Sequence, residues 1–371
     1  MAQRTKPPFR ADHVGSLIRP QELRDARQAR LEGRLPAAEL AAIEDRLIRE
    51  VIALQERVGL QAVTDGEFRR TSFREVLFES MHGFSTERVD TDFSFSYADG
   101  SSRRATPVPR VVSRLERNGS MAAGDFRFLK TATKATPKVM LPAPSLAHWF
   151  VGDRVLADSP YADAGEYMAD IAGIYREEIA ELASLGCTYV QIDEVPIPVI
   201  CDPAVQATIA ARGEDPMALI DLYVDTINDA IRDRPPGMTV VVHMCRGNEG
   251  VAGLGSGGYE AVAERVFGRL KVDGYLLEYD TPRAGGFAPL GAVPKDKGVV
   301  LGLISSKTPQ IEDIDTLKRR VDDAARHIDL DRLAVSPQCG FASAAIGNPL
   351  TDADERIKLR RTVELAELIW K

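Results

Sequence analysis

The sequence contains none of the segments that mark membrane or secreted proteins. No run approaches about 18 consecutive apolar residues, so we expect no transmembrane helix and no membrane partner. Residues 1–8 carry charges with no apolar stretch behind them, and we therefore expect no signal peptide. Basic residues are not in excess, because 47 Lys and Arg stand against 55 Asp and Glu. The net charge of −8 gives no reason to expect nucleic acid as a partner.

Cysteine is scarce, with four residues in a chain of 371. They are Cys187, Cys201, Cys245 and Cys339, which lie far apart in the sequence. Cysteines placed in this way in a chain of this size are more often structural, metal-bound or reactive than paired in disulfides. With 44% hydrophobic and 27% charged residues, the composition is that of a soluble globular protein, and we expect a cytoplasmic location.

Short apolar segments alternate with amphipathic helical patterns along most of the chain, which is typical of a parallel sheet. The open, doubly wound sheet usually carries a glycine-rich phosphate loop after its first strand, and no such loop follows here. Eight units in a chain of this length therefore favour an α/β fold of the closed (β/α)₈ type, the TIM barrel. The expected strands are 9–17, 61–64, 138–141, 188–193, 238–242, 274–280, 298–304 and 333–336, and the main expected helices are 20–31, 36–58, 162–185, 216–232, 259–270, 311–327 and 352–369.

Residues 86–135 break this alternation. The stretch is rich in Ser, Arg, Gly and Asp, and it contains alternating apolar residues such as Phe93, Phe95 and Tyr97. We interpret it as an antiparallel hairpin or small subdomain inserted into a single catalytic domain that comprises residues 1–371.

The apolar run 238–242 leads directly into His243 and Cys245. Residues i and i+2 leave a strand on the same face, so the two side chains can bind one object together. An imidazole and a thiolate suit Zn²⁺. Because the functional residues of a TIM barrel gather at the carboxyl ends of its strands, Glu278 and Cys339 are the expected third and fourth ligands, with Asp280 as an alternative to Glu278.

A His, Cys, Glu, Cys site of this kind carries a ligand charge of −3 against the +2 of the metal. Such an electron-rich site can accept a further thiolate and keep it nucleophilic. Coordination to the metal deprotonates a thiol near neutral pH. The residues therefore predict a zinc-activated thiol that attacks an electrophilic carbon.

Taken together, the strand ends resemble the catalytic barrel of cobalamin-independent methionine synthase, in its short, single-barrel form. The resemblance implies transfer of a methyl group to the zinc-bound thiolate of homocysteine, which gives methionine. The segments that carry it are Val14-Gly15-Ser16, Asp65-Gly66-Glu67, Pro142-Ala143-Pro144-Ser145 with Trp149, Gln191-Ile192-Asp193-Glu194, His243-Met244-Cys245, Glu278 and Cys339.

The resemblance also implies roles for the remaining residues. Glu67 and Asp193 would hold the amino group of homocysteine, since a desolvated ammonium needs opposite charge. Ser16 and the backbone of Gly15 would hold its carboxylate. Trp149 would stack on a folate, although packing of its own loop is an equal expectation.

One departure from the family concerns the seventh strand. The synthases carry His-Ser-Pro after it, with the histidine in the role of the acid that protonates the leaving nitrogen. Here the segment reads Ser305-Ser306-Lys307-Thr308-Pro309, which makes Lys307, with Asp193, the expected catalytic pair. An ammonium with an ordinary pKa near ~10.4 is a poorer acid at neutral pH, so Lys307 could instead anchor a phosphate or carboxylate. The methyl donor stays open between a folate, a corrinoid protein and another methylated compound.

Two other functions remain to be weighed. A zinc site could activate a different thiol, such as coenzyme M, for epoxide opening, but a sulfonate would need cations where Glu67 and Asp193 predict an ammonium. A non-catalytic barrel that binds zinc and a thiol is the other alternative. Closed structural zinc sites normally draw ligands at tight local spacing, whereas these ligands come from distant segments.

Overall fold

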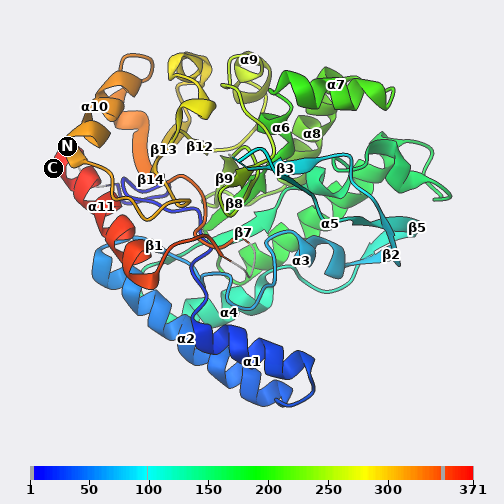
Figure 1. Ribbon diagram of the computed structural model, residues 1–371, viewed down its shortest axis with the longest axis horizontal. Helices are drawn as coiled ribbons and strands as arrows, with labels where there is room; N and C mark the ends of the chain where they lie inside the picture. The colour runs from blue at the N-terminus through cyan, green and yellow to red at the C-terminus, as the bar shows by residue number, and fades with distance from the viewer. Residues whose placement is uncertain (1–3, 98, 344–346, 371) are drawn as a thin grey trace.

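The computed structural model describes residues 4–97, 99–343 and 347–370. Six parallel strands form its central sheet in the order β14-β13-β12-β9-β8-β7 (Figure 1). Val190 lies opposite Val240 and Tyr275 opposite Val242, and the register between β13 and β14 shifts between Gly302 and Ile304. The strands are β7 (Val139–Pro142), β8 (Tyr189–Glu194), β9 (Thr239–Met244), β12 (Gly274–Glu278), β13 (Gly298–Ile304) and β14 (Leu333–Pro337).

Two further segments close the sheet into a ring. Strand β1 (Ala62–Val63) runs parallel to β6 (Thr136–Pro137), which continues into β7 through Lys138. At the other edge, Ala11 forms a parallel bridge with Val335 of β14. The ring therefore has eight strand positions, which are segment 9–12, β1, β6 with β7, and the five later strands. This confirms the expected TIM barrel.

The interior of the ring holds its own cluster of buried side chains, drawn from most of the strand positions. Burying a Val, Leu or Phe side chain contributes about 1.5–3 kcal/mol, so this cluster and the larger layer between strands and helices hold the strand ends in fixed positions. The inner cluster consists of Phe9, Val14, Ala62, Tyr189, Val241, Leu276, Val300 and Ala334.

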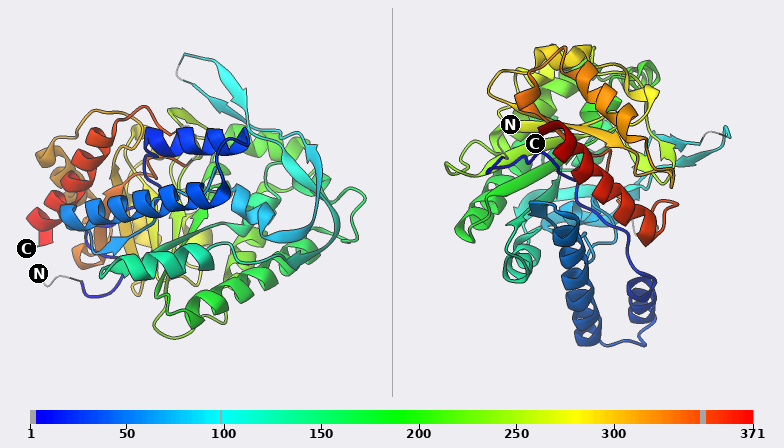
Figure 2. Two further views of the ribbon diagram at one scale, coloured as in Figure 1. Left: turned by 90° about the horizontal axis from the view of Figure 1, so that it is seen from below. Right: turned by 90° about the vertical axis from the view of Figure 1, so that its left-hand side faces the viewer.

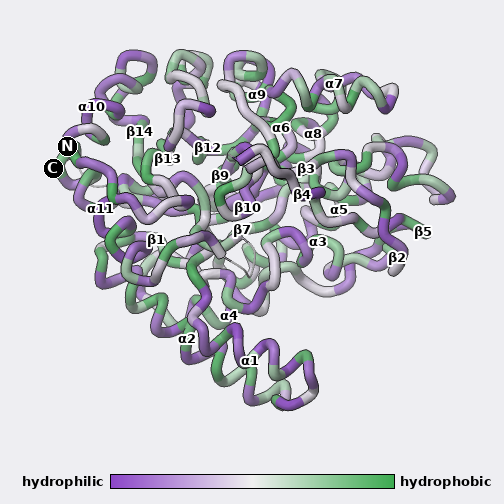
Figure 3. Tube along the Cα trace, viewed as in Figure 1, coloured by the Kyte–Doolittle hydropathy of each residue, from purple (hydrophilic) through white to green (hydrophobic). Residues whose placement is uncertain are grey.

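Helices surround the ring, and hydrophilic and hydrophobic residues alternate along them, as expected for helices with one face on a sheet (Figure 3). Asp163 and Asp215 cap α5 and α8 with their side chains. The helices are α1 (Gln21–Leu31), α2 (Ala37–Val58), α3 (Glu75–Glu79), α4 (Ala123–Ala132), α5 (Ala164–Ser184), α6 (Pro196–Val199), α7 (Pro203–Ala211), α8 (Pro216–Ala230), α9 (Ala263–Phe267), α10 (Ile314–Ala324) and α11 (Asp352–Trp370).

One expected helix is much shorter than its pattern indicated. Residues 259–270 contain only the single turn and a half of α9. Tyr259 is fully buried and donates a 2.8 Å hydrogen bond to the carbonyl of Met244, so the segment before α9 packs against the end of β9 as a loop. Among the described residues, no helix is long and apolar enough to cross a membrane.

The irregular stretch forms antiparallel ribbons outside the ring. Strand β2 (Met81–Val89) pairs with β5 (Val108–Arg117), so this pairing begins at Met81 and ends at Arg117, and the last part of the stretch is helix α4. Between them, β3 (Ser94–Ser96) and β4 (Ser102–Arg104) form a hairpin that stands out from the body in Figure 2. Strand β3 also pairs with β11 (Ala252–Gly253), which pairs with β10 (Asn248–Glu249).

The β3–β4 hairpin therefore pairs with the loop that follows His243 and Cys245. Ser96 of β3 lies opposite Gly253 of β11. Arg103 of β4 makes an ion pair with Glu249 of β10. The hairpin thus extends over the carboxyl ends of the barrel strands.

Candidate metal and substrate site

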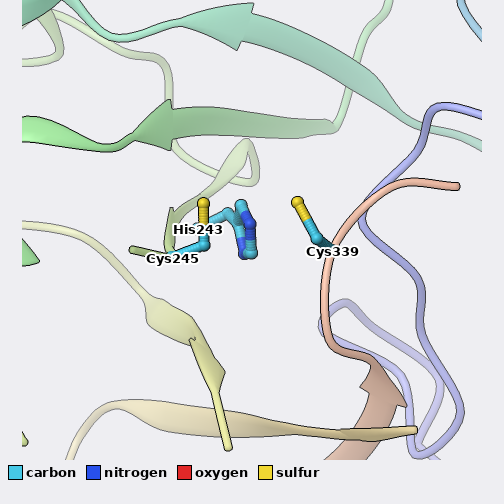
Figure 4. Close-up of side chains that lie close together, drawn as sticks. All are labelled: His243, Cys245 and Cys339. Carbon is cyan, nitrogen blue, oxygen red and sulfur yellow. The ribbon is translucent and has the colours of Figure 1, made fainter. Parts of the chain in front are cut away.

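Three of the four predicted metal ligands come together at the carboxyl end of the barrel. One ligand atom of each of His243, Cys245 and Cys339 lies within 4.8 Å of the others, and all three residues are buried. His243 is in β9, Cys245 follows the strand, and Cys339 follows β14. In Figure 4 the imidazole of His243 lies between the two sulfur atoms.

Hydrogen bonding prepares the histidine for a ligand. Nδ1 of His243 lies 3.2 Å from the carbonyl oxygen of Leu276, which fixes Nδ1 as the protonated nitrogen. Nε2 is buried and has no hydrogen-bond partner among the described residues. An imidazole held through one nitrogen and free at the other is the usual arrangement of a metal-ligating histidine.

The two cysteines of the cluster shift each other's pKa in opposite directions. The hydrogen bond from Cys245 lowers the pKa of Cys339 well below its ordinary value, while the same bond and burial raise the pKa of Cys245. Two buried cysteine sulfurs and one imidazole nitrogen form a donor set that fits Zn²⁺.

Glu278, the fourth expected ligand, does not join this group. Arg283 Nε at 2.9 Å and Lys307 Nζ at 3.3 Å contact its Oε1. The backbone N–H of Arg246 and the side-chain amide of Gln338 each donate to Oε2 at 2.9 Å. Burial opposes its charge, but Lys307, Arg283 and Arg246 outweigh that effect and lower the pKa of Glu278 to about 2.

Lys307 lies behind Glu278 and not at the substrate cavity. Its Nζ is 3.1 Å from both carboxylate oxygens of Asp280. The side chain is 8% exposed, and Lys307 is not among the residues that line the cavity described next. Asp280, the alternative ligand, is thus paired with Lys307.

A cavity of about 500 Å³ opens beside the predicted metal ligands. Its inner wall combines the predicted metal and substrate residues. Its outer wall combines aromatic and charged residues, two of them from the β3–β4 hairpin. The inner wall includes Ser16, Glu67, Asp193, His243, Cys245 and Cys339, and the outer wall includes Phe73, Arg74, Phe95, Arg103, Phe150 and Glu249.

Glu67 presents an unpaired carboxylate oxygen at this wall. It sits in a tight turn with φ at +59°, in which its N–H donates to Asp65 Oδ1 at 2.9 Å. Oε1 lies 3.5 Å from Nη1 of Arg70, whereas Oε2 is buried and has no hydrogen-bond partner in the part of the chain that the structure describes. Burial, only partly offset by Arg70, raises the pKa of Glu67 to about 7.

Asp193 is the second carboxylate of the inner wall. Gln191 donates from Nε2 to its Oδ1 at 2.6 Å, which orients the group from within the same strand. Burial raises the pKa of Asp193 to about 6, while His243 opposes the shift. A cation that entered between Asp193 and Glu67 would satisfy both carboxylates.

The segment that contains Gly15 and Ser16 is fixed by close contacts. Gly15 has φ at +135°, and a Cβ there would lie 2.6 Å from the side chain of Met140. Its carbonyl accepts a 2.7 Å hydrogen bond from Thr64 Oγ1. Ser16 faces the cavity, and a Cβ on Gly340 would lie 1.9 Å from its Oγ. Only glycine at position 340 lets this loop pass Ser16 in its present rotamer.

Trp149 does not reach the cavity. It is 0% exposed and stacks on Phe93, with ring centroids 4.1 Å apart and an interplanar angle of 7°. The aromatic rings that do line the cavity are Phe73, Phe95 and Phe150. The sequence did not indicate that these three rings line the cavity. Only the alternating apolar pattern around Phe95 could have indicated it for one of them.

A TIM barrel with a buried thiol and imidazole cluster facing two carboxylates defines a barrel enzyme that acts on a small molecule. The family model described as "Cobalamin-independent synthase, Catalytic domain" matches residues 9–367. The chain therefore belongs to the cobalamin-independent methionine synthase family, whose members are enzymes of the methyltransferase type.

Relatives and solved structures agree with this assignment. YxjH, an uncharacterized protein of Bacillus subtilis (strain 168), is 39% identical over 99% of this chain and 96% of its own length. The 5-methyltetrahydropteroyltriglutamate–homocysteine methyltransferase of Rhodococcus jostii (strain RHA1) is 25% identical over 96% of this chain, but this match spans only 42% of that enzyme.

Among solved structures, a Listeria monocytogenes protein proposed to be a vitamin-B12-independent methionine synthase matches with a TM-score of 0.73. It is 30% identical, over 99% of this chain and all of its own. A B12-independent methionine synthase from Shewanella sp. W3-18-1, solved with selenomethionine, matches with a TM-score of 0.74 and 22% identity over 97% of both chains, and this likeness supports the fold.

Proposed function

We propose that this protein is a zinc-dependent thiol S-methyltransferase whose acceptor is homocysteine and whose product is methionine. One observation carries the proposal: a cluster of zinc-type ligands and two carboxylates with room for a cation line the same small cavity. Homocysteine has a thiol at one end and an ammonium at the other. The cavity offers a partner for each.

The metal group comprises His243, Cys245 and Cys339. A zinc ion held there would supply the chemistry of such sites, in which a bound thiol loses its proton at neutral pH and becomes a strong nucleophile. The chain's own residues orient the rest of the amino acid. Because ligand and ammonium partners stand on one rigid barrel, the sulfur is fixed when the amino group is bound.

At the other end of the substrate, Glu67 and Asp193 would accept hydrogen bonds from the ammonium, and Ser16 would donate its hydroxyl to the carboxylate. Oε2 of Glu67 has no partner within the described chain, so an ammonium would complete its bonding. A buried, unpaired carboxylate is costly unless a ligand satisfies it.

The outer wall of the cavity would receive the methyl donor. Phe73, Phe95 and Phe150 offer flat apolar surface, and Arg74 and Arg103 add positive charge. Each arginine is paired with a glutamate that also lines the cavity, Arg74 with Glu75 and Arg103 with Glu249, so the support for an aromatic donor comes from the three rings. Flat apolar surface suits a methylated aromatic ring, which supports methyltetrahydrofolate over a corrinoid protein as the donor. The β3–β4 hairpin would limit water access during transfer.

Alkylation of coenzyme M or a similar sulfonated thiol is less well supported. Its sulfonate would meet the negative charges of Glu67 and Asp193 at the inner wall. We further propose that the enzyme works in the cytoplasm, where reducing conditions keep its four free cysteines as thiols.

The test combines zinc analysis with turnover of homocysteine. Methyltetrahydrofolate with one or several glutamates, methylcobalamin and simple methylated compounds serve as donors. We expect one zinc per chain and methionine from the folate. Cys339→Ala should lose both the zinc and the activity. Cys201→Ser, which changes a buried cysteine outside the cluster, should keep both. Methionine from methylcobalamin alone would exclude the folate donor. No methionine from any donor at full zinc content would overturn homocysteine as the acceptor.

A further inference from the structure

We propose that Gln191 is a positioning residue that fixes the two ends of the amino-acid site relative to each other and thereby selects one enantiomer of homocysteine. The inference rests on the proposed function, in which Asp193 binds the ammonium and Ser16 binds the carboxylate. Gln191 is fully buried and is absent from the described residues that line the cavity, so it acts through its neighbours.

Gln191 lies between the barrel interior and the cavity. In strand β8, residues 189, 191 and 193 share one face, because alternate side chains of a strand point the same way. Tyr189 belongs to the inner cluster of the barrel, and Asp193 lines the cavity. The amide of Gln191 therefore occupies the layer directly beneath the ammonium site.

The side-chain nitrogen of Gln191 donates to two acceptors at once. One is Oδ1 of Asp193 at 2.6 Å, and the other is the carbonyl oxygen of Val14 at 2.7 Å. An amide nitrogen has two N–H donors, and both are used here. The orientation of the amide is fixed, because a flipped amide would place its oxygen against two acceptors.

The side-chain oxygen of Gln191 supports the same interpretation. Oε1 is buried and has no hydrogen-bond partner among the described residues. A buried acceptor without a partner costs free energy, which an apolar side chain of the same size would avoid. The presence of an amide at this position therefore indicates that its two donated bonds are its role.

The segment that contains Val14 depends on contacts of this kind, because residues 13–16 belong to no strand. Asp12, just before them, accepts a 2.7 Å hydrogen bond from the hydroxyl of Tyr189. Val14 accepts from Gln191, two residues further along the same face of β8. This second contact directly precedes the carboxylate-binding residues and joins them to the ammonium site.

Homocysteine would be held at three points around its asymmetric carbon. The thiol would lie at the predicted metal ligands, the ammonium at Asp193 and Glu67, and the carboxylate at Ser16. Three fixed points distinguish enantiomers, since a mirror image can satisfy only two of them at once. The discrimination requires a constant spacing between the ammonium and carboxylate partners, and the two bonds of Gln191 maintain that spacing.

Two variants remove this connection in different ways. Gln191→Met keeps the length and approximate volume of the side chain and removes both donors. Gln191→Asn keeps the amide but is one methylene shorter, so it cannot span Val14 and Asp193 together, and it serves if the methionine variant folds poorly. Val300→Ala is the control. It removes buried volume from the inner cluster and lowers stability, but it lies on β13, which provides none of the three attachment points.

Calorimetric titration of the zinc-loaded full chain measures the Kd of L- and D-homocysteine and of two truncated thiols. 4-Mercaptobutyrate lacks the ammonium and 3-mercaptopropylamine lacks the carboxylate, so each uses only one end of the site. In both Gln191 variants we expect the Kd of L-homocysteine to rise about tenfold and the preference for the L enantiomer to fall several-fold. Val300→Ala should keep the wild-type preference.

The truncated thiols show whether the two ends are coupled. If Gln191 sets the spacing between them, the fold loss for L-homocysteine exceeds the product of the fold losses for the two truncated thiols. A loss no larger than that product would show that Gln191 supports each end separately and would overturn the inference. An unchanged ratio of L to D affinity would overturn it as well.

Hydrogen exchange of the free protein gives a readout that needs no substrate. The N–H of Leu17, which donates to the carbonyl of Gly66 at 3.1 Å, reports on the end of the anchored segment. Peptides that cover residues 13–18 should exchange faster in both Gln191 variants than in wild type, and peptides from β12 should be unchanged. Wild-type exchange in residues 13–18 of the variants would contradict the anchoring role.

These outcomes separate the two proposals. If zinc-loaded wild type binds no homocysteine, the proposed function fails and the selection of an enantiomer fails with it, while hydrogen exchange still decides whether Gln191 anchors residues 13–16. If wild type forms methionine but the Gln191 variants keep the wild-type preference for one enantiomer, only the inference fails.

Discussion

Arg70 lies 3.5 Å from Oε1 of Glu67 and donates a 3.0 Å hydrogen bond to the carbonyl of Met140. One oxygen of Glu67 is therefore tied to the barrel wall, while the other has no partner within the described chain. The arrangement orients a carboxylate toward the cavity without neutralising it fully. We interpret this geometry as the ammonium end of the substrate site.

The ammonium assignment can be tested with Glu67→Gln and Asp193→Asn. A hydrogen bond to a charged group is worth about 1.5–3 kcal/mol, so each change should raise the homocysteine Kd about 10–100-fold. The comparison ligand is 4-mercaptobutyrate, which lacks the amino group. Wild type should prefer homocysteine, and the Glu67→Gln variant should lose most of that preference. Equal preference in wild type and variant would contradict the assignment.

Gly340→Ala tests the contact between two distant loops. The new Cβ would lie 1.9 Å from Ser16 Oγ, so the hydroxyl has to leave its present position. We expect KM for homocysteine to rise several-fold, with a loss of about 1–3 kcal/mol in the free energy of unfolding. In a Ser16→Ala background the same change should have little further effect on KM. An equal KM effect in both backgrounds would separate Ser16 from substrate binding.

Arg103→Ala tests the hairpin over the cavity. Its partner is Glu249, and the guanidinium side chain is 53% exposed, so the pair contributes at most about 1 kcal/mol to stability. We expect an unchanged melting temperature and a several-fold higher KM for the methyl donor. Arg104→Ala is the control, because successive strand residues point to opposite faces. A similar KM in both variants would remove the hairpin from donor binding.

Glu355 should give the protein a measurable pH dependence of stability. It is buried, and burial raises its pKa to about 8, although its carboxylate accepts a 2.7 Å hydrogen bond from the N–H of Ile18. Between pH 4.5, its ordinary pKa, and pH 8, the folded state holds a proton that the unfolded state has lost. The free energy of unfolding should therefore fall as pH rises, by up to about 1.4 kcal/mol per unit.

Glu355→Gln removes this contribution, because the amide is neutral at every pH and can still accept from Ile18. The difference in unfolding free energy between the variant and wild type should grow as pH rises from about 4.5 to 8 and be constant below that window. Urea unfolding at several pH values measures it. A constant difference throughout would show that Glu355 is ionised in the folded protein.

The cluster of predicted metal ligands illustrates how far the sequence could place side chains. His243 and Cys245 were recognisable because an i, i+2 pair at the end of an apolar strand has one structural outcome. Cys339 followed from the eight-strand pattern, since the ends of barrel strands share one rim. In each case a local pattern and the closure of the ring were sufficient to place the residue.

Other placements depend on contacts that no local pattern encodes. Glu278 stands at the expected strand end, but its environment is set by Lys307, from the loop after β13, and by Arg283, five residues further along its own loop. Trp149 is turned away from the cavity because Phe93, from the inserted stretch, stacks on it. The hairpin's position over the site follows from the pairing of Ser96 with Gly253, between segments far apart in the sequence.

The central claim is that the thiol of homocysteine binds a zinc ion held by His243, Cys245 and Cys339. Zinc K-edge absorption on the purified, zinc-loaded protein tests it most directly. Without substrate, we predict two sulfur neighbours at about 2.3 Å and lighter atoms in the remaining positions. With saturating homocysteine, a third sulfur at the same distance should replace one light atom. A sulfur count that stays at two while homocysteine is bound would contradict the account.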